Sequence, residues 1–325
     1  MKFVLYGPQA RLGVIQGARI LDLQRAALAM GESTGEWRER VAPVLASLIT
    51  LIEAGDRGLD WVRTVMEESA GADHPDLHVN LTQTVLHAPF PGKRFALAGS
   101  NNASHVADAY TNLGKPITPD EVRAKTRRGK AGGFWVIDPP VGPEAGVPYP
   151  ASSNGLFDYE AEVAVVLGQG GKKVKADAWS NRVWGTTLVI DWSIRSEDLL
   201  ASRQPFYSHK IFDNSKSLGP WIVVDEGIDP SACDVETLVN GQVRQRFNSR
   251  DMIHSFGELL EQMSEELTLQ AGDILSGGTG PGTAADKTVP KPDGSLPLDL
   301  FLKPGDRVTV SSPQLGTLAA HITAS

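Results

Sequence analysis

Apolar and polar residues alternate along residues 157–168, which read Phe-Asp-Tyr-Glu-Ala-Glu-Val-Ala-Val-Val-Leu-Gly. A period of two is typical of a β-strand, so Glu160 and Glu162 are predicted to point to the same face of one strand. A second strand-like run, residues 186–190, is uncharged and leads to Asp191. The side chains of these three acids can therefore converge where two strands lie side by side.

The first 90 residues combine strand patterns with helical ones. Residues 2–6, 11–15 and 19–23 are predicted as short strands separated by glycine-containing turns. Residues 26–30, 37–52 and 61–69 have apolar positions at helical spacing, and Pro43 fits the first turn of the middle helix because it would break a helix interior. We interpret residues 1–90 as a small α+β domain that packs against a larger domain of residues 91–325.

The rest of the chain alternates strands with charged or glycine-rich loops. A short strand at residues 95–99 leads into a helix that places His105 and Asp108 on one face. Residues 111–133 lack periodicity and predict a loop or lid, whereas the Asn240-Gly241 pair predicts a hairpin. Other expected elements are a strand at 133–137, a turn and short helix at 192–198, a turn at 219–220 before a buried strand, an amphipathic helix at 253–267 and a strand at 269–275.

Composition and charge narrow the possible partners. The chain has 325 residues, a net charge of -8 and one cysteine, Cys233. We expect no nucleic-acid partner, because such binding needs clustered Lys and Arg; the basic run at 123–130 is interpreted as a solvated loop or an anion contact. A single cysteine excludes an internal disulfide. No run is apolar enough for a signal peptide or a membrane span, so we expect a cytoplasmic protein without membrane contact.

The convergence of Glu160, Glu162 and Asp191 would need a counter-charge. Three carboxylates cannot share a small, partly desolvated space unless a cation lies between them or one of them binds a proton. A divalent cation is the simplest solution, and oxygen ligands favour Mg2+, with Mn2+ or Ca2+ as alternatives, over zinc. The competing interpretation is a solvated edge strand, the usual setting of a Glu-x-Glu pair. Against it, the face that carries the glutamates continues with Ala164 and Val166.

Three other features carry candidate chemistry. A carboxylate beside His105 would hold its tautomer and raise its basicity, as a general base requires, although an isolated His-x-x-Asp is more commonly a surface pair. Lys210 lies among aromatic residues, where a cation needs an anionic partner, either a substrate oxygen or a structural aspartate. The glycine-rich residues 276–280 offer backbone amides to a carboxylate or an oxyanion, with a plain turn as the alternative.

With these pieces in order, residues 93–325 resemble the fumarylacetoacetate hydrolase family. The motifs that carry the resemblance are Gly99-x-Asn101-x3-His105, Asp158-Tyr159-Glu160-x-Glu162, Asp191-x-Ser193-x-Arg195, Lys210-x-Phe212-Asp213, Leu218-Gly219-Pro220, Gly272-Asp273-Ile274, Gly278-Thr279 and Pro304-Gly305-Asp306. The resemblance implies an α+β, β-rich fold with a mixed, rolled β-sheet. It also implies a divalent metal held by Glu160, Glu162 and Asp191, and a lid helix with a catalytic His105–Asp108 dyad.

The resemblance further implies that Lys210 neutralises developing negative charge and that Arg195, Gly278 and Thr279 hold substrate oxygens. Our first hypothesis is a metal-dependent hydrolase that cleaves a carbon–carbon bond of a β-diketone or a 2,4-dioxo acid, of the acylpyruvate or fumarylacetoacetate type. The second is an isomerase, tautomerase, hydratase or decarboxylase acting on an unsaturated 2-oxo acid through the same enolate chemistry. A non-catalytic ligand-binding protein ranks last. The family also leads us to expect a homodimer.

Overall fold

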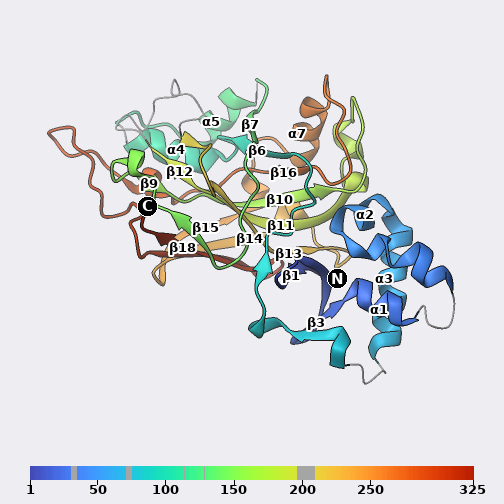
Figure 1. Cartoon of the computed structure of the whole chain (residues 1–325). Helices are drawn as coiled ribbons and strands as arrows, with labels where there is room; N and C mark the ends of the chain where they lie inside the picture. Colours follow the sequence, from blue (N-terminus) through green and yellow to red (C-terminus); the bar gives the residue numbers. More distant parts are fainter. Residues whose placement is uncertain (31–34, 71–74, 113, 128, 196–208) are drawn as a thin grey trace.

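A mixed sheet of eleven strands forms the largest unit of the computed structural model, which describes residues 1–30, 35–70, 75–112, 114–127, 129–195 and 209–325 (Figure 1). Strands β16 and β6 run parallel, and the other neighbours in the main row pair antiparallel. In sheet order the row is β4 (His78–Asn80), β3 (Arg19–Asp22), β2 (Arg11–Gln16), β1 (Lys2–Tyr6), β13 (Lys216–Val223), β11 (Val183–Asp191), β10 (Ala161–Leu167), β16 (Ile274–Ser276), β6 (Phe95–Gly99) and β7 (Gly132–Val136), with β5 (Leu86–His87) beside β1.

A second sheet of five strands and a two-stranded ribbon complete the described β-structure. In order, the second sheet is β15 (Gln242–Asn248), β14 (Asp234–Val239), β17 (Arg307–Ser312), β18 (Gly316–Thr323) and β8 (Ala145–Pro148), and the ribbon pairs β12 (Ser193–Ile194) with β9 (Phe157–Asp158). The predicted hairpin is confirmed: Asn240 and Gly241 join β14 to β15 with φ values of 50° and 79°, as a tight hairpin turn requires. The predicted β-rich fold with a mixed sheet is likewise confirmed.

Strand β10 is buried on both faces because a hydrophobic core lies on each side of it. Ala161, Val163 and Val165 pack into one core, whereas Ala164 and Val166 pack into the other. The period of two is therefore correct, and it separates two cores rather than a core from solvent. The alternative of a solvated edge strand is wrong, since β10 has β11 on one side and β16 on the other.

Of the three predicted N-terminal helices, the first and third are longer than the sequence pattern predicts and the middle one is shorter. They are α1 (Leu23–Met30), α2 (Leu48–Glu53) and α3 (Gly55–Ala70), and the expected continuous helix over 37–52 is wrong. Residues Trp37–Val41 form a π-helical turn, and Pro43 precedes a short 3-10 turn because it has no N–H to continue a helix. Ser47 then takes an extended conformation, and its side chain accepts a hydrogen bond from the Thr50 amide to cap α2.

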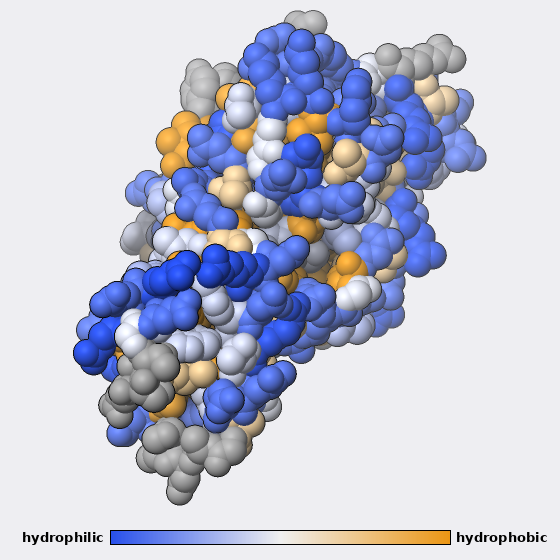
Figure 2. Space-filling view, turned by 90° about the vertical axis from the view of Figure 1, so that its right-hand side faces the viewer, coloured by the Kyte–Doolittle hydropathy of each residue, from blue (hydrophilic) through white to orange (hydrophobic). Residues whose placement is uncertain are grey.

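The N-terminal strands extend the same sheet that carries the glutamate strand. Lys2 and Phe3 of β1 pair with Val223 and Ile222 of β13, and one hydrophobic core spans both parts. The proposed domain division at residue 90 stays a prediction. Figure 2 shows the side of the molecule that lies to the right in Figure 1; hydrophilic residues cover most of it, and hydrophobic ones form small scattered groups. No described helix is both long and apolar enough to span a lipid bilayer.

In the part of the chain that the structure describes, the remaining α-helices are α4 (Ala103–Asn112), α5 (Pro119–Thr126), α7 (Phe256–Met263) and α8 (Ala284–Lys287). The expected loop over 111–133 is wrong in part: Thr118 and Glu121 form a reciprocal capping box, with Pro119 in the first turn, and so begin α5. The expected turn at 219–220 is also wrong, because β13 continues through both residues, with a register shift opposite Thr186 and Leu188. The short helix expected at 192–198 lies in part outside the described residues; Ser193 and Ile194 form β12.

Candidate active site

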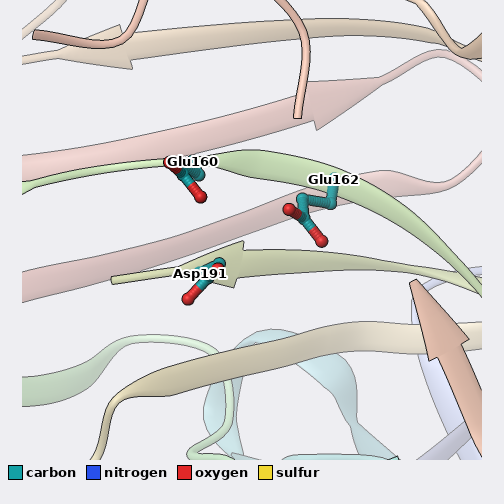
Figure 3. Close-up of side chains that lie close together, drawn as sticks. All are labelled: Glu160, Glu162 and Asp191. Atoms are coloured by element: carbon teal, nitrogen blue, oxygen red, sulfur yellow. The ribbon is translucent and has the colours of Figure 1, made fainter. Parts of the chain in front are cut away.

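Glu160, Glu162 and Asp191 meet because β10 and β11 are antiparallel neighbours. Ala161 pairs with Ile190 in the register, and the Asp191 amide donates a hydrogen bond to the Glu160 carbonyl at 2.8 Å. The three side chains lie close together on adjacent strands (Figure 3), and one carboxylate oxygen from each acid lies within 4.8 Å of the others. The residues are 6%, 1% and 2% exposed, in that order. The predicted convergence is confirmed, and it occurs in a buried setting.

Three described cations, Lys210, Arg195 and Lys216, form ion pairs with Glu160 or Asp191. Lys210 Nζ lies 2.5 Å from Glu160 Oε2 and 2.8 Å from Asp191 Oδ2, and Arg195 Nη2 lies 2.5 Å from Glu160 Oε1. Burial alone would raise the pKa of Glu160, but Lys210 and Arg195 outweigh it and lower that pKa. Glu162 differs: burial, followed by the charges of Asp191 and Glu160, holds its pKa well above the ordinary value. Among the described residues, no cation forms an ion pair with Glu162, so its charge is the least compensated of the three.

The donor set fits a hard divalent cation. All three side chains offer oxygen, the atom type that Mg2+, Mn2+ and Ca2+ prefer. Asp191 Oδ1 is buried and accepts no hydrogen bond from the described residues, although Lys216 Nζ lies 2.9 Å away as an ion-pair partner. A buried carboxylate oxygen without a hydrogen bond is costly unless another group completes its surroundings. A divalent cation would do so and would also relieve the repulsion at Glu162.

Arg195 is held by an acid that sequence reasoning did not single out as functional. Its Nε donates to Asp158 Oδ2 at 2.9 Å. Asp158 also accepts hydrogen bonds from the amides of Ala284 at 2.8 Å and Ala285 at 3.1 Å, in the first turn of α8. The guanidinium therefore joins Glu160 to the start of α8, and Asp158 acts as its buried anchor. The Asp-Tyr-Glu-x-Glu motif could have indicated this role, because Asp158 is two residues before Glu160 and a strand period of two places both on the same face.

His105 pairs with a different carboxylate from the one that the sequence predicts. Its Nδ1 lies 2.8 Å from Asp286 Oδ2, so the His105–Asp108 pairing is corrected to His105–Asp286. Asp286 is fixed in turn by the amides of Gly282 at 2.9 Å and Thr283 at 3.2 Å. Burial would lower the pKa of His105, but the charge of Asp286 and its hydrogen bond raise it above the ordinary value. Asp108 lies nearby: its pKa is raised by burial and by the charge of Asp286.

The two helices that bring this dyad together have local capping signals. The Asn102 side chain accepts hydrogen bonds from the amides of Ser104 at 3.0 Å and His105 at 3.1 Å, and so caps α4. Thr283 and Asp286 form a capping box around α8. The Thr-x-x-Asp pattern would have predicted a helix start at 283, but not that Asp286 meets a histidine 181 positions earlier in the chain.

The glycine-rich loop is braced by two buried amide side chains. Gln245 Nε2 donates to Thr279 Oγ1 and to the Gly280 carbonyl, both at 2.9 Å, and Gln245 Oε1 accepts a hydrogen bond from the Ala161 amide at 3.2 Å. Asn101 Nδ2 donates to the Gly277 carbonyl at 2.9 Å. Gly278 has a φ of 89°, which L side chains rarely adopt. The loop is thus fixed beside the glutamate strand, and the substrate-binding roles of Gly278 and Thr279 stay predictions.

Residues 96–323 match the family described as "Fumarylacetoacetate (FAA) hydrolase C-terminal", and the chain belongs to this family of enzymes. Among curated proteins, it is 29% identical over 314 residues to the oxaloacetate tautomerase YisK of Bacillus subtilis (strain 168), an alignment that covers 95% of this chain and 94% of that protein. The match therefore includes the N-terminal region as well as the family domain.

Solved structures show the same fold. The maleylpyruvate hydrolase from Sphingobium sp. SYK-6, in complex with manganese(II) ion and pyruvate, matches over 100% of both chains with a TM-score of 0.68 and 22% identity. The 2-hydroxyhepta-2,4-diene-1,7-dioate isomerase from Mycobacterium marinum matches over 76% of this chain and 81% of its own, with a TM-score of 0.58 and 25% identity. In this chain, the buried acidic triad places three oxygen donors close enough together to hold one metal ion.

Proposed function

We propose that this protein is a divalent-metal-dependent tautomerase that interconverts the enol and keto forms of a small 2-oxo acid such as oxaloacetate. The observation that carries the proposal is the position of the His105–Asp286 dyad beside the Glu160–Glu162–Asp191 cluster. The two are close enough for the charge of Glu160 to raise the pKa of His105. The tautomerase relative, which aligns along nearly the whole chain, supports this choice over the hydrolase that we placed first from sequence.

Tautomerisation needs the transfer of one proton and consumes no water. A proton moves between the carbon beside the carbonyl and the enol oxygen, so atoms and charge balance without a co-reactant. His105 would carry that proton, and Asp286 would hold the imidazole and stabilise its protonated form. The raised pKa of His105 suits a group that must be protonated for part of the cycle.

The surrounding groups would bind and orient the substrate. A bound divalent ion, of which Mg2+ or Mn2+ suits the oxygen donors best, would supply a Lewis acid for the carbonyl and carboxylate oxygens. Lys210, whose Nζ lies 2.5 Å from Ser193 Oγ and between two acids, would balance the negative charge of the enolate. The fixed Thr279 loop and Arg195 would orient the carboxylate of the substrate.

A second candidate is hydrolysis of a carbon–carbon bond in a 2,4-dioxo acid. The observation that favours it is the same dyad, because a carboxylate-oriented imidazole is also suited to deprotonating water for attack on a carbonyl. In that reaction the bond between the attacked carbonyl carbon and its neighbour breaks, and the departing carbanion takes up a proton.

The two candidates differ in product mass. Purified protein with Mn2+ is mixed with enol-oxaloacetate, and the loss of enol absorbance is followed while mass spectrometry examines the product. The proposal predicts faster ketonisation at unchanged mass, with loss of the effect after chelation and recovery with Mn2+. A parallel incubation with an acylpyruvate tests hydrolysis: two fragments, together with no effect on enol-oxaloacetate, would reverse the order of the candidates.

A further inference from the structure

Lys216 is a buried cation directly behind the carboxylate cluster, and the chemistry proposed above does not use it. It begins β13 and pairs with Asp191 in the register of β11. Its side chain is 0% exposed, and its Nζ lies 5.7 Å and 5.9 Å from the ring centroids of Phe134 and Phe212. A lysine in such surroundings is rare unless its charge is compensated by partners.

The surroundings of Lys216 Nζ are those of an ammonium ion. The group donates to the Lys210 carbonyl at 2.6 Å and to the Ser215 carbonyl at 2.8 Å, and it lies 2.9 Å from Asp191 Oδ1. Two of these contacts are hydrogen bonds to carbonyl oxygens, and the third is an ion pair with a buried carboxylate, which favours the charged form of the lysine. The same nitrogen thus contacts both a carboxylate of the cluster and the main chain of Lys210, whose own ammonium lies between Glu160 and Asp191.

We propose that Lys216 is a positioning residue that fixes the Lys210 main chain against Asp191, and that its charge weakens the hold of the carboxylate cluster on a divalent cation. The first part follows from its hydrogen bond to the Lys210 carbonyl. The second follows from Coulomb repulsion, which is strong between buried charges a few ångströms apart. The inference rests on the metal site of the proposed function, and it predicts that Lys216 has opposite effects on metal affinity and on turnover.

The test compares Lys216→Met, which removes the charge at similar length, with Lys216→Gln, which removes the charge but keeps two N–H donors. The matched control is Lys172→Met, since Lys172 pairs with Glu266 at the surface, at 3.3 Å. Mn2+ is titrated into chelator-treated protein by calorimetry, and kcat and KM are measured separately. Both Lys216 variants should bind Mn2+ about tenfold tighter. Lys216→Met should also lose about tenfold in kcat because Lys210 loses its anchor, and Lys216→Gln should lose less.

A purely structural role for Lys216 would give a different result. Loss of packing alone would weaken Mn2+ binding and turnover together, so unchanged or weaker Mn2+ affinity in both variants would overturn the proposal. Circular dichroism identifies folded variants, and failure of both variants to fold would show that Lys216 serves stability alone and would also overturn it. Failure of this inference can be distinguished from failure of the proposed tautomerase function. If the protein is not a tautomerase, wild-type turnover is absent, but the Mn2+ titrations still show whether Lys216 lowers the metal affinity.

Discussion

Two buried acidic sites in this protein differ in how completely their charges are paired. Asp22, at the end of β3, is 1% exposed and accepts hydrogen bonds from the Tyr6 hydroxyl at 2.6 Å, from Arg11 Nε at 2.5 Å and from the Arg25 amide at 2.9 Å. Burial would raise the pKa of Asp22, but Arg11 and Tyr6 lower it. Its carboxylate is stable as an anion and has a structural role.

Glu162 is buried to the same extent, but none of the cationic side chains that the structure describes forms an ion pair with it. It is 1% exposed and accepts a hydrogen bond from the Ser276 hydroxyl, and burial together with Asp191 and Glu160 raises its pKa. The difference teaches that burial of an acid does not by itself indicate function. Function is indicated instead by a buried carboxylate whose negative charge is not compensated by a cation, because folding has placed that charge there at a cost in stability.

The largest expected effect comes from removing the charge of Glu162. We expect Glu162→Gln to lower kcat/KM on the order of 10³-fold, since the cluster loses one of its three anionic ligands. Its metal-free stability should not fall, because the substitution removes a repelled carboxylate. Steady-state kinetics with Mn2+ and urea unfolding after chelation measure the two effects. A large loss of metal-free stability would show that Glu162 is paired in the same way as Asp22.

The reverse pattern is expected for Asp22→Asn. Removing one member of a buried ion pair leaves Arg11 uncompensated and should lower the free energy of unfolding by about 3 kcal/mol. The urea midpoint reports the loss, while the Mn2+ affinity of the folded variant should equal that of the wild type. A change in that affinity would contradict the separation between the two sites.

The next largest effect is expected from a substitution in the His105–Asp286 dyad. Asp286→Asn should lower kcat about 10²-fold, because the carboxylate that orients His105 and stabilises its protonated form is lost. The matched control is Asp108→Asn, because Asp108 is an exposed acid on the same helix as His105, and we expect a change of only a few fold. If the control variant loses as much activity as Asp286→Asn, the pairing inferred from the sequence is the one that matters for turnover.

The smallest effect is a difference in pH dependence. The pKa of Asp22 is lower in the folded protein than the ordinary value of 3.8, so Asp22 contributes stability above pH 3.8 that is lost as the pH falls through its folded pKa. Glu162 has the opposite sign. Its pKa in the metal-free folded protein lies above the ordinary value of 4.5, so the folded state binds more protons between the two values and stability falls as the pH rises.

We therefore expect the unfolding free energy of metal-free wild type to decline as the pH rises above 4.5 through the folded pKa of Glu162. In Glu162→Gln this decline should be absent, and in Asp22→Asn it should persist. Urea unfolding at a series of pH values, with chelator present, measures it. Equal pH profiles for wild type and Glu162→Gln would show that Glu162 is not repelled in the metal-free protein.

The sequence predicted those parts of the site that depend on short-range periodicity. Glu160 and Glu162 share a face because a strand has a period of two, and Asp191 followed from the uncharged run before it. Asp286 and Lys216 were missed because their roles arise from tertiary contacts: His105 and Asp286 are 181 positions apart, and Lys216 meets Asp191 only through the register of β11 and β13. The prediction of one helix over 37–52 was wrong. It relied on the spacing of apolar residues and gave too little weight to Pro43, which precedes a separate 3-10 turn.

The most direct test of the metal site is calorimetric titration of Mn2+ into chelator-treated wild type, Glu162→Gln and Asp22→Asn. The account predicts one Mn2+ per chain with equal affinity in wild type and Asp22→Asn, and loss of that binding in Glu162→Gln. Absence of binding to the wild type, or equal binding by Glu162→Gln, would contradict it.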